Sequence, residues 1–86
     1  MFGIKCIATA TNDNPNFAGE VKTYYYGKKQ ARLDDEGKVL KWHVDEYGYS
    51  KKAMAERGLK SLEKVFTETS VKFPSYWTYE FSIVEL

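Results

Sequence analysis

Three stretches of the chain alternate between apolar and polar residues, which is the pattern of a half-buried β-strand. In residues 3–10, Ile4 and Cys6 fall on one face and Lys5 falls on the other. Residues 20–26 and 77–83 repeat the period of two with β-branched and aromatic side chains, which favour strands. We therefore predict strands over these three stretches, the last of them continuing to the carboxyl end.

Two further strands are predicted on either side of an acidic turn at residues 34–37. Gly37 at the end of this turn suits the left-handed conformation that closes many hairpin loops. Residues 29–33 and 38–44 would then form the two arms of a hairpin. In the second arm Trp42 shares a face with two aliphatic residues, so we expect this face to be buried.

The clearest element is an amphipathic helix over residues 51–69. At about 100° per residue its apolar side chains sweep one continuous arc, and every charged residue between residues 52 and 68 lies outside that arc. Gly58 lies inside the arc, although glycine costs a helix about 1 kcal/mol relative to alanine. We interpret Gly58 as the point where another element approaches the helix backbone closely. Phe73 and Pro74 are expected to end any helix before the last strand.

The predicted order of elements is β-β-β-β-α-β, which belongs to the α+β class. A chain of 86 residues has room for one hydrophobic core, so residues 1–86 are expected to form a single domain. We predict a mostly antiparallel sheet of about five strands, with the helix covering one of its faces.

Charge and cysteine content exclude several classes of protein. Thirteen basic and twelve acidic residues give a formal net charge of +1, unlike a strongly acidic DNA mimic or a basic nucleic-acid coat protein. A single cysteine cannot form an internal disulfide, and Cys6 with His43 falls short of the four ligands of a structural zinc site. The amino terminus lacks the form of a signal peptide, and no stretch approaches about 18 apolar residues. We expect a cytoplasmic protein without a membrane span or a cofactor.

Few groups in the sequence have the chemistry that catalysis needs. Cys6 and His43 could form a nucleophilic dyad, since a thiol needs a base to become a thiolate. Cys6 lies on the apolar face of its strand, however, where a small core residue is the simpler interpretation. Two carboxylate runs, at residues 34–36 and 45–46, lie at predicted turns, where charged side chains are usually solvated. We therefore expect no enzymatic activity.

A surface rich in tyrosine and lysine in the middle of the chain indicates binding instead. Residues 21–41 hold six basic residues against three acidic ones. On the second strand we expect Val21, Thr23 and Tyr25 to face the helix, which leaves the opposite face of that strand open. The residues predicted to bind a partner are Lys22, Tyr24, Tyr26, Lys28, Lys29, Tyr47 and Tyr49.

These residues allow two kinds of partner. Tyrosine and arginine are enriched among interface hot spots and the net charge is close to zero, so a non-enzymatic protein that binds another protein or protein complex is the leading hypothesis. The alternative is a small nucleic-acid-binding domain, in which tyrosines stack on bases and lysines hold phosphates.

In its size, its single α+β domain, its lack of a catalytic motif and its tyrosine-rich surface, the chain resembles the small phage-encoded proteins, anti-CRISPR proteins among them, that act by binding a host machine. Tyr24, Tyr26, Tyr47, Tyr49 and Tyr76 are the tyrosines concerned. The resemblance implies an inhibitor that occupies a functional surface of a host protein complex.

Overall fold

The structure, a computed structural model, describes residues 1–72 and 76–86, with side chains described for residues 1–68 and 76–86. Its main sheet has three antiparallel strands in the order β2-β1-β5, and its small second sheet consists of β3 and β4. The strands are β1 (Phe2–Ala10), β2 (Val21–Tyr26), β3 (Asp34–Asp35), β4 (Lys38–Val39) and β5 (Trp77–Glu85). The helices are the 3₁₀ turn η1 (Lys28–Gln30), α1 (Lys41–Tyr47) and α2 (Lys52–Lys72). The α+β class is confirmed, but two sheets replace the predicted single sheet of five strands.

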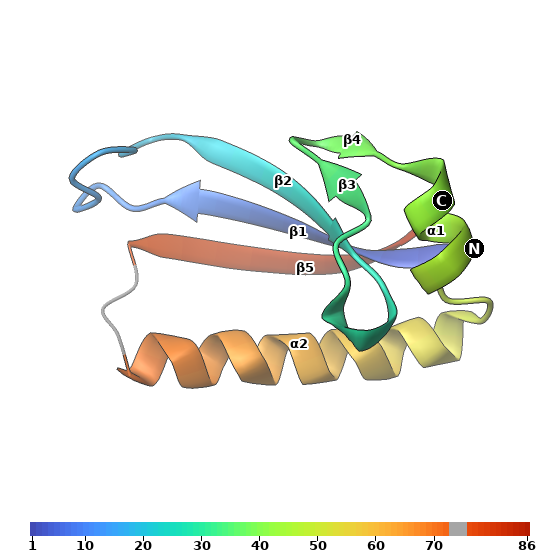
Figure 1. The fold of residues 1–86 in the computed structure, drawn as a ribbon. Coiled ribbons are helices and arrows are strands. Elements are labelled where there is room, and N and C mark those ends of the chain that lie inside the picture. Colours follow the sequence, from blue (N-terminus) through green and yellow to red (C-terminus); the bar gives the residue numbers. More distant parts are fainter. Residues whose placement is uncertain (73–75) are drawn as a thin grey trace.

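Helix α2 runs along one face of the three-stranded sheet and packs on it through the centre of its apolar arc (Figure 1). Ala55 and Leu62 of α2 are buried against Ile4 of β1 and against Tyr49, with Phe81 and Ile83 of β5 packed around them. Met54 and Val65, at the margins of the arc, are 40% and 37% exposed. The helix therefore covers one face of the sheet, as predicted, through the centre of its arc. The predicted helix stop at residues 73 and 74 lies outside the described residues.

The side chains of β2 face opposite to the prediction. In the antiparallel register Cys6 lies opposite Tyr24 on one side and Phe81 on the other, and Ile4 lies opposite Tyr26. Directly opposite residues share a face of the sheet. Tyr24 and Tyr26 are therefore on the α2 face with the core residues of β1, and the prediction that Val21, Thr23 and Tyr25 face the helix is wrong. The alternation alone could not decide the matter, because β2 carries aromatic residues on both faces.

The predicted hairpin exists but is much shorter than expected. Its arms are only two residues each, and Gly37 adopts the expected left-handed conformation with φ of 86°. The predicted strand at residues 29–33 is wrong, because Lys29 and Gln30 have positive φ values and turn the chain. The predicted strand at residues 38–44 is also wrong beyond Val39, since residues 41–47 form α1.

Trp42, expected to be buried, is 63% exposed on α1. A short apolar run fits both periods, and burial of Val44 selects the helical one here. The hairpin and α1 lie on the side of the sheet away from α2 (Figure 1). There Leu33, which is fully buried, lies over Gly3, where a Cβ would come within 3.2 Å of its Cδ1.

Candidate partner-binding surface

In the part of the chain that the structure describes, the outer edge of β2 is open over about half of its length. Ala10 donates its N–H to the Glu20 carbonyl at 2.8 Å, so the even-numbered residues of β2 bond to β1 and the odd-numbered ones point outward. Tyr25 bonds outward at both groups, because its N–H donates to Asp34 Oδ1 and its carbonyl accepts from Leu33 N–H, each at 2.8 Å. Within residues 1–72 and 76–86, no backbone group pairs with the outward N–H and C=O of Val21 and Thr23.

A buried carboxylate organises the segment beside this edge. The side chain of Asp34 is fully buried and accepts hydrogen bonds from the N–H groups of Tyr25 and Gly37. It also accepts two from Arg32, Nε to Oδ1 at 3.0 Å and Nη2 to Oδ2 at 3.3 Å. Burial alone would raise the pKa of Asp34, but the hydrogen bonds from Arg32, Tyr25 and Gly37 outweigh burial and hold that pKa below its ordinary value. Asp34 thus stays charged and fixes Arg32.

Arg32 in turn lies over a tyrosine of β2. Its guanidinium carbon is 4.3 Å from the centroid of the Tyr24 ring, which is within the range of a cation–π contact. Because both Asp34 oxygens hold the guanidinium, the stack of Arg32 on Tyr24 is preorganised. Arginine and tyrosine are also two of the residue types most enriched among interface hot spots.

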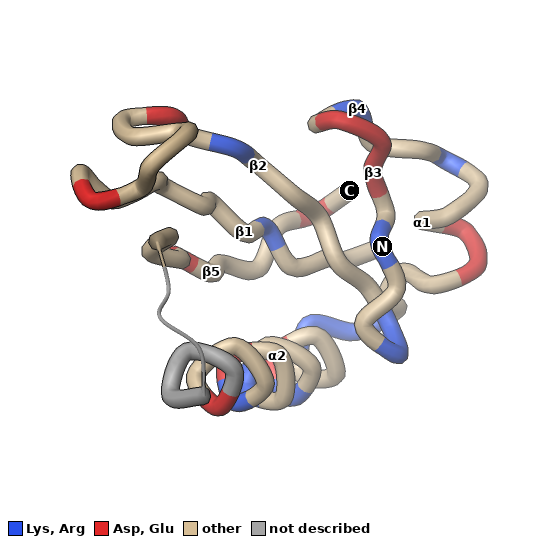
Figure 2. Tube along the Cα trace, turned by 60° about the vertical axis from the view of Figure 1, so that its left-hand side comes forward, with Lys and Arg blue, Asp and Glu red and all other residues tan. Residues whose placement is uncertain are grey.

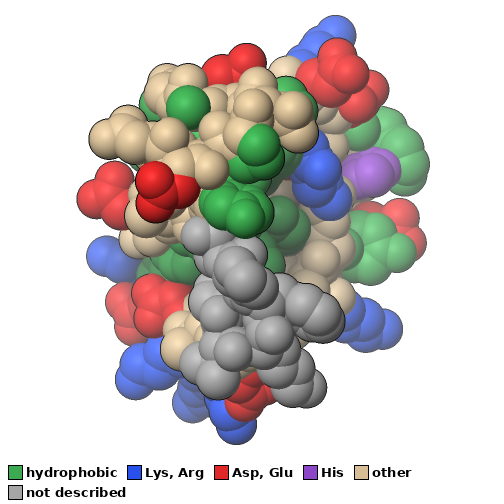
Figure 3. Space-filling view, turned by 90° about the vertical axis from the view of Figure 1, so that its left-hand side faces the viewer, with side chains coloured by type: hydrophobic (Ala, Val, Ile, Leu, Met, Phe, Trp, Pro, Cys, Tyr) green, Lys and Arg blue, Asp and Glu red, His purple; other side chains and the backbone are tan. Residues whose placement is uncertain are grey.

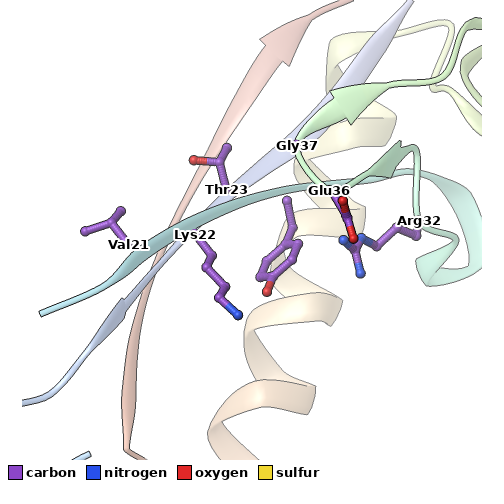
Figure 4. A pocket seen from close by; sticks show the side chains of 7 residues that line it. Val21, Lys22, Thr23, Arg32, Glu36 and Gly37 are labelled. Carbon is purple, nitrogen blue, oxygen red and sulfur yellow. The ribbon is translucent and has the colours of Figure 1, made fainter. Parts of the chain in front are cut away.

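These groups line an open pocket of about 480 Å³, which we call the β2-edge pocket (Figure 4). Its lining residues are Val21, Lys22, Thr23, Tyr24, Arg32, Glu36 and Gly37. Figure 4 shows Lys22 and Thr23 pointing to opposite sides of β2, while Arg32 and Glu36 come from the segment of the small hairpin. Unpaired backbone groups, an aromatic ring and charges of both signs therefore meet at one place.

At the end of the pocket away from Arg32, Lys22 contacts two aromatic rings. Its ammonium lies 4.8 Å from the centroid of the Phe17 ring and 5.6 Å from that of Trp77. The two rings are 6.0 Å apart. Figure 3 shows hydrophobic side chains reaching the surface among charged ones at this end of the molecule, where the β1–β2 connection lies. The pocket therefore continues into a partly apolar surface.

Of the seven residues predicted to bind a partner, Lys22 and Tyr24 line the β2-edge pocket. Tyr49 is only 8% exposed and its hydroxyl donates to the Gly27 carbonyl, so it belongs to the core rather than to an accessible surface. Tyr26 is half-buried, with its ring edge-on to Phe66 of α2 at 6.3 Å. Lys28 and Lys29 lie in η1, next to α2 (Figure 1), and Tyr47 is half-buried in α1.

The sequence interpretation did not single out Arg32 as a site residue. Its position two residues before Asp34 is the usable signal, because a short-range ion pair can fix a guanidinium next to a strand. Figure 2 shows the basic residues of the middle of the chain spread over β2, the η1 turn, β4 and α1, with the acidic turn of the hairpin among them. They do not form one basic face.

The groups considered for catalysis are not brought together. Cys6 is fully buried on the α2 face of β1, and burial raises the pKa of its thiol to about 11. His43 Nδ1 donates to the Arg32 carbonyl at 2.7 Å, and Cys6 and His43 make no hydrogen bond with each other. No cluster of three or more metal-ligating side chains occurs among the described residues. Asp34 is engaged in the ion pair with Arg32, while the other four carboxylates of the two runs are exposed.

Comparison of the chain with protein-family models, with curated proteins and with solved structures gave no match. Over the described residues, no helix has the length and apolar character needed to cross a membrane.

Proposed function

We propose that the chain is a non-enzymatic protein-binding domain whose β2-edge pocket accepts an extended segment of another protein. One observation carries the proposal: the unpaired N–H and C=O of Val21 and Thr23 lie beside the fixed stack of Arg32 on Tyr24. An extended segment added to a sheet edge gains affinity from main-chain hydrogen bonds and specificity from side-chain pockets beside the edge. Both elements of that mode are present here.

The charge distribution supports a protein partner over nucleic acid. Arg32 is held by the buried Asp34, and Glu36 adds a negative charge to the lining of the pocket. A nucleic-acid site needs a continuous basic surface along the phosphates. The basic residues of the middle of the chain are instead dispersed over several elements (Figure 2). The resemblance to phage-encoded inhibitors stays a prediction, and it makes a host protein complex the first partner to test.

The proposal is tested by removing a single backbone donor. Proline at position 23 deletes the outward N–H of Thr23, and proline is tolerated on an edge strand where the N–H faces solvent. We expect Thr23→Pro to abolish capture of a partner from a nuclease-treated lysate, while Thr23→Ala, which loses the side chain but keeps the N–H, retains it. Circular dichroism checks that both variants fold. Equal capture by the two variants would contradict the proposed site.

Salt dependence separates the two kinds of partner. Counterion release makes nucleic-acid affinity fall steeply as salt rises, whereas a contact based on strand addition and aromatic packing responds less. We expect capture to persist at high salt and after nuclease treatment. Capture that disappears under either condition would favour the nucleic-acid alternative.

A further inference from the structure

Among the described residues, the second outer edge of the main sheet, on β5, is unpaired over a longer stretch than the edge of β2. Leu86 donates its N–H to the Met1 carbonyl and Thr11 donates to the Tyr76 carbonyl, each at 2.8 Å. These bonds fix the parity of the ladder, so the even-numbered residues of β5 bond to β1 and the odd-numbered ones point outward. The outward backbone groups of Tyr79, Phe81 and Ile83 pair with no segment of the described chain.

Among the described residues, this edge carries few of the usual protections against pairing. Natural edge strands are blunted by lysine, proline, bulges or short length. β5 is nine residues long, contains no lysine and no proline, and has only Glu80 and Glu85 as charged residues. At about 3.3 Å per residue it presents an edge of roughly 30 Å.

An aromatic groove lies beside the same edge. The rings of Tyr79 and Phe81 lie 4.8 and 5.2 Å from the ring of Phe66 on α2, and Tyr79 is 39% exposed. The groove between α2 and β5 encloses about 570 Å³. Its remaining lining residues, Glu63, Thr67, Trp77, Thr78 and Glu80, come from the same two elements. A strand added to β5 would place every second side chain over this groove.

We infer that the occupant of this edge is a second copy of the chain, bound antiparallel through β5 about a two-fold axis at Phe81. In this register the outward backbone groups of Tyr79, Phe81 and Ile83 all pair with the same three residues of the second copy. Tyr79 lies opposite Ile83 of the second copy and Phe81 opposite its own equivalent, so apolar side chains meet on the α2 face. On the other face Glu80 lies opposite Ser82 of the second copy.

Charge and paired length favour this register over the two neighbouring ones. A two-fold axis at Glu80 would place the two Glu80 carboxylates directly opposite each other, which is unfavourable. A two-fold axis at Ser82 would shorten the paired stretch. The axis at Phe81 avoids both problems, keeps both α2 helices on one face and joins the two three-stranded sheets into one of six strands. The interface uses the opposite edge of the sheet from the β2-edge pocket, so it does not depend on the proposed function.

The test uses charge at position 82, because Ser82 is exposed and lies opposite Lys5 within one chain and opposite Glu80 of the second copy in the proposed dimer. Sedimentation equilibrium of the full chain from micromolar to millimolar concentration measures the dimer dissociation constant. We expect Ser82→Glu to raise the dissociation constant by about 2-fold to 30-fold, since two symmetric like-charge contacts each contribute roughly 0.2–1 kcal/mol. Ser82→Lys is expected to lower the dissociation constant or leave it unchanged.

The intrachain effect of these variants runs the other way, because Lys5 attracts a carboxylate and repels a lysine at position 82. A loss of folding therefore cannot explain a higher dissociation constant for Ser82→Glu than for Ser82→Lys. Adding Glu80→Lys to Ser82→Glu restores opposite charges across the interface and is expected to restore dimerisation. Thr23→Pro, on the other edge, is expected to leave it unchanged.

Three outcomes would overturn the inference. The first is a wild-type chain that stays monomeric at every concentration, even if a segment of another protein binds to this edge. The second is a dimer whose dissociation constant is the same with either charge at position 82. The third is a dimer abolished by Thr23→Pro, which would place the interface on β2.

Discussion

The Tyr49 hydroxyl lies directly over Gly58 of α2, where a Cβ would come within 2.7 Å of Cζ and closer still to the hydroxyl oxygen. Tyr49 continues the sheet beside β1, because its N–H donates to the Phe2 carbonyl at 2.8 Å and its carbonyl accepts from Phe2 N–H at 2.7 Å. Its hydroxyl reaches on to the Gly27 carbonyl at 3.3 Å. The absence of a side chain at position 58 thus lets one tyrosine connect β1, α2 and the end of β2. This confirms the close approach predicted at Gly58.

Gly58→Ala is expected to destabilise the domain by about 1–3 kcal/mol, as overpacking of a core typically does. The substitution would otherwise stabilise a helix by about 1 kcal/mol, so a loss of stability reports the contact with Tyr49. Chemical denaturation measures the free energy of unfolding. As a control, the same substitution in a Tyr49→Phe background is expected to cost less, since the hydroxyl is gone. A Gly58→Ala protein more stable than wild type would show that Tyr49 does not pack here.

Leu62→Ala is expected to lower the free energy of unfolding by about 2–5 kcal/mol, because Leu62 is 2% exposed within the core formed with Ile4 and Ala55. Met54→Ala provides the matched control on the same helix, since Met54 is 40% exposed. Equal denaturation midpoints for the two variants would contradict the packing of α2 described above.

Asp34 is expected to make the free energy of unfolding depend on pH in the acidic range. Its pKa is lowered in the folded state, so the folded state binds fewer protons than the unfolded state and stability rises with pH in this range. The contribution is complete above the ordinary value of 3.8 and is lost as the pH falls through the lower folded pKa. Unfolding free energies measured from neutral to acidic pH are expected to show a smaller acid-dependent loss for Asp34→Asn than for wild type. An unchanged pH profile would indicate that other carboxylates control acid unfolding.

Cys6 is expected to be inert in the folded protein, because it is fully buried and its pKa is raised by burial to about 11. A thiol-specific reagent at neutral pH is expected to react with it quickly only in denaturant. Cys6→Ala is expected to retain partner binding. Rapid modification of the native chain, together with loss of binding in a folded Cys6→Ala variant, would revive the thiol as a functional group.

Tyr24→Ala is expected to weaken binding of a protein partner by more than about 1 kcal/mol, since it removes the ring on which Arg32 is stacked. Trp42→Ala is the matched control, because Trp42 is an aromatic residue with 63% exposure that does not line the β2-edge pocket. Titration calorimetry with the captured partner compares the two. Equal losses would mean that the binding surface extends to α1.

Local patterns in the sequence determined β1, β2, β5 and α2. Strong alternation at residues 3–10 and 77–83 and a continuous apolar arc in the helix each involve many residues, so the periods of two and 3.6 are unambiguous there. The left-handed Gly37 was predictable for the same local reason, because backbone conformation at a turn depends on the residue itself. The close contact at Gly58 was predictable because this glycine leaves a gap in the apolar face of the helix. The sequence did not show that Tyr49 fills the gap.

Tertiary structure alone decided the rest. Residues 38–44 fit a strand and a helix equally well, and packing of Val44 selected α1. The two faces of β2 are similarly aromatic, so only the register that sets Tyr24 opposite Cys6 determined which one meets α2. The open edges of β2 and β5 arise from the strand order β2-β1-β5. The stack of Arg32 on Tyr24 forms because the segment that holds Arg32 lies beside the outer edge of β2. Strand order depends on contacts between distant segments, which no local pattern of hydrophobic and polar residues encodes.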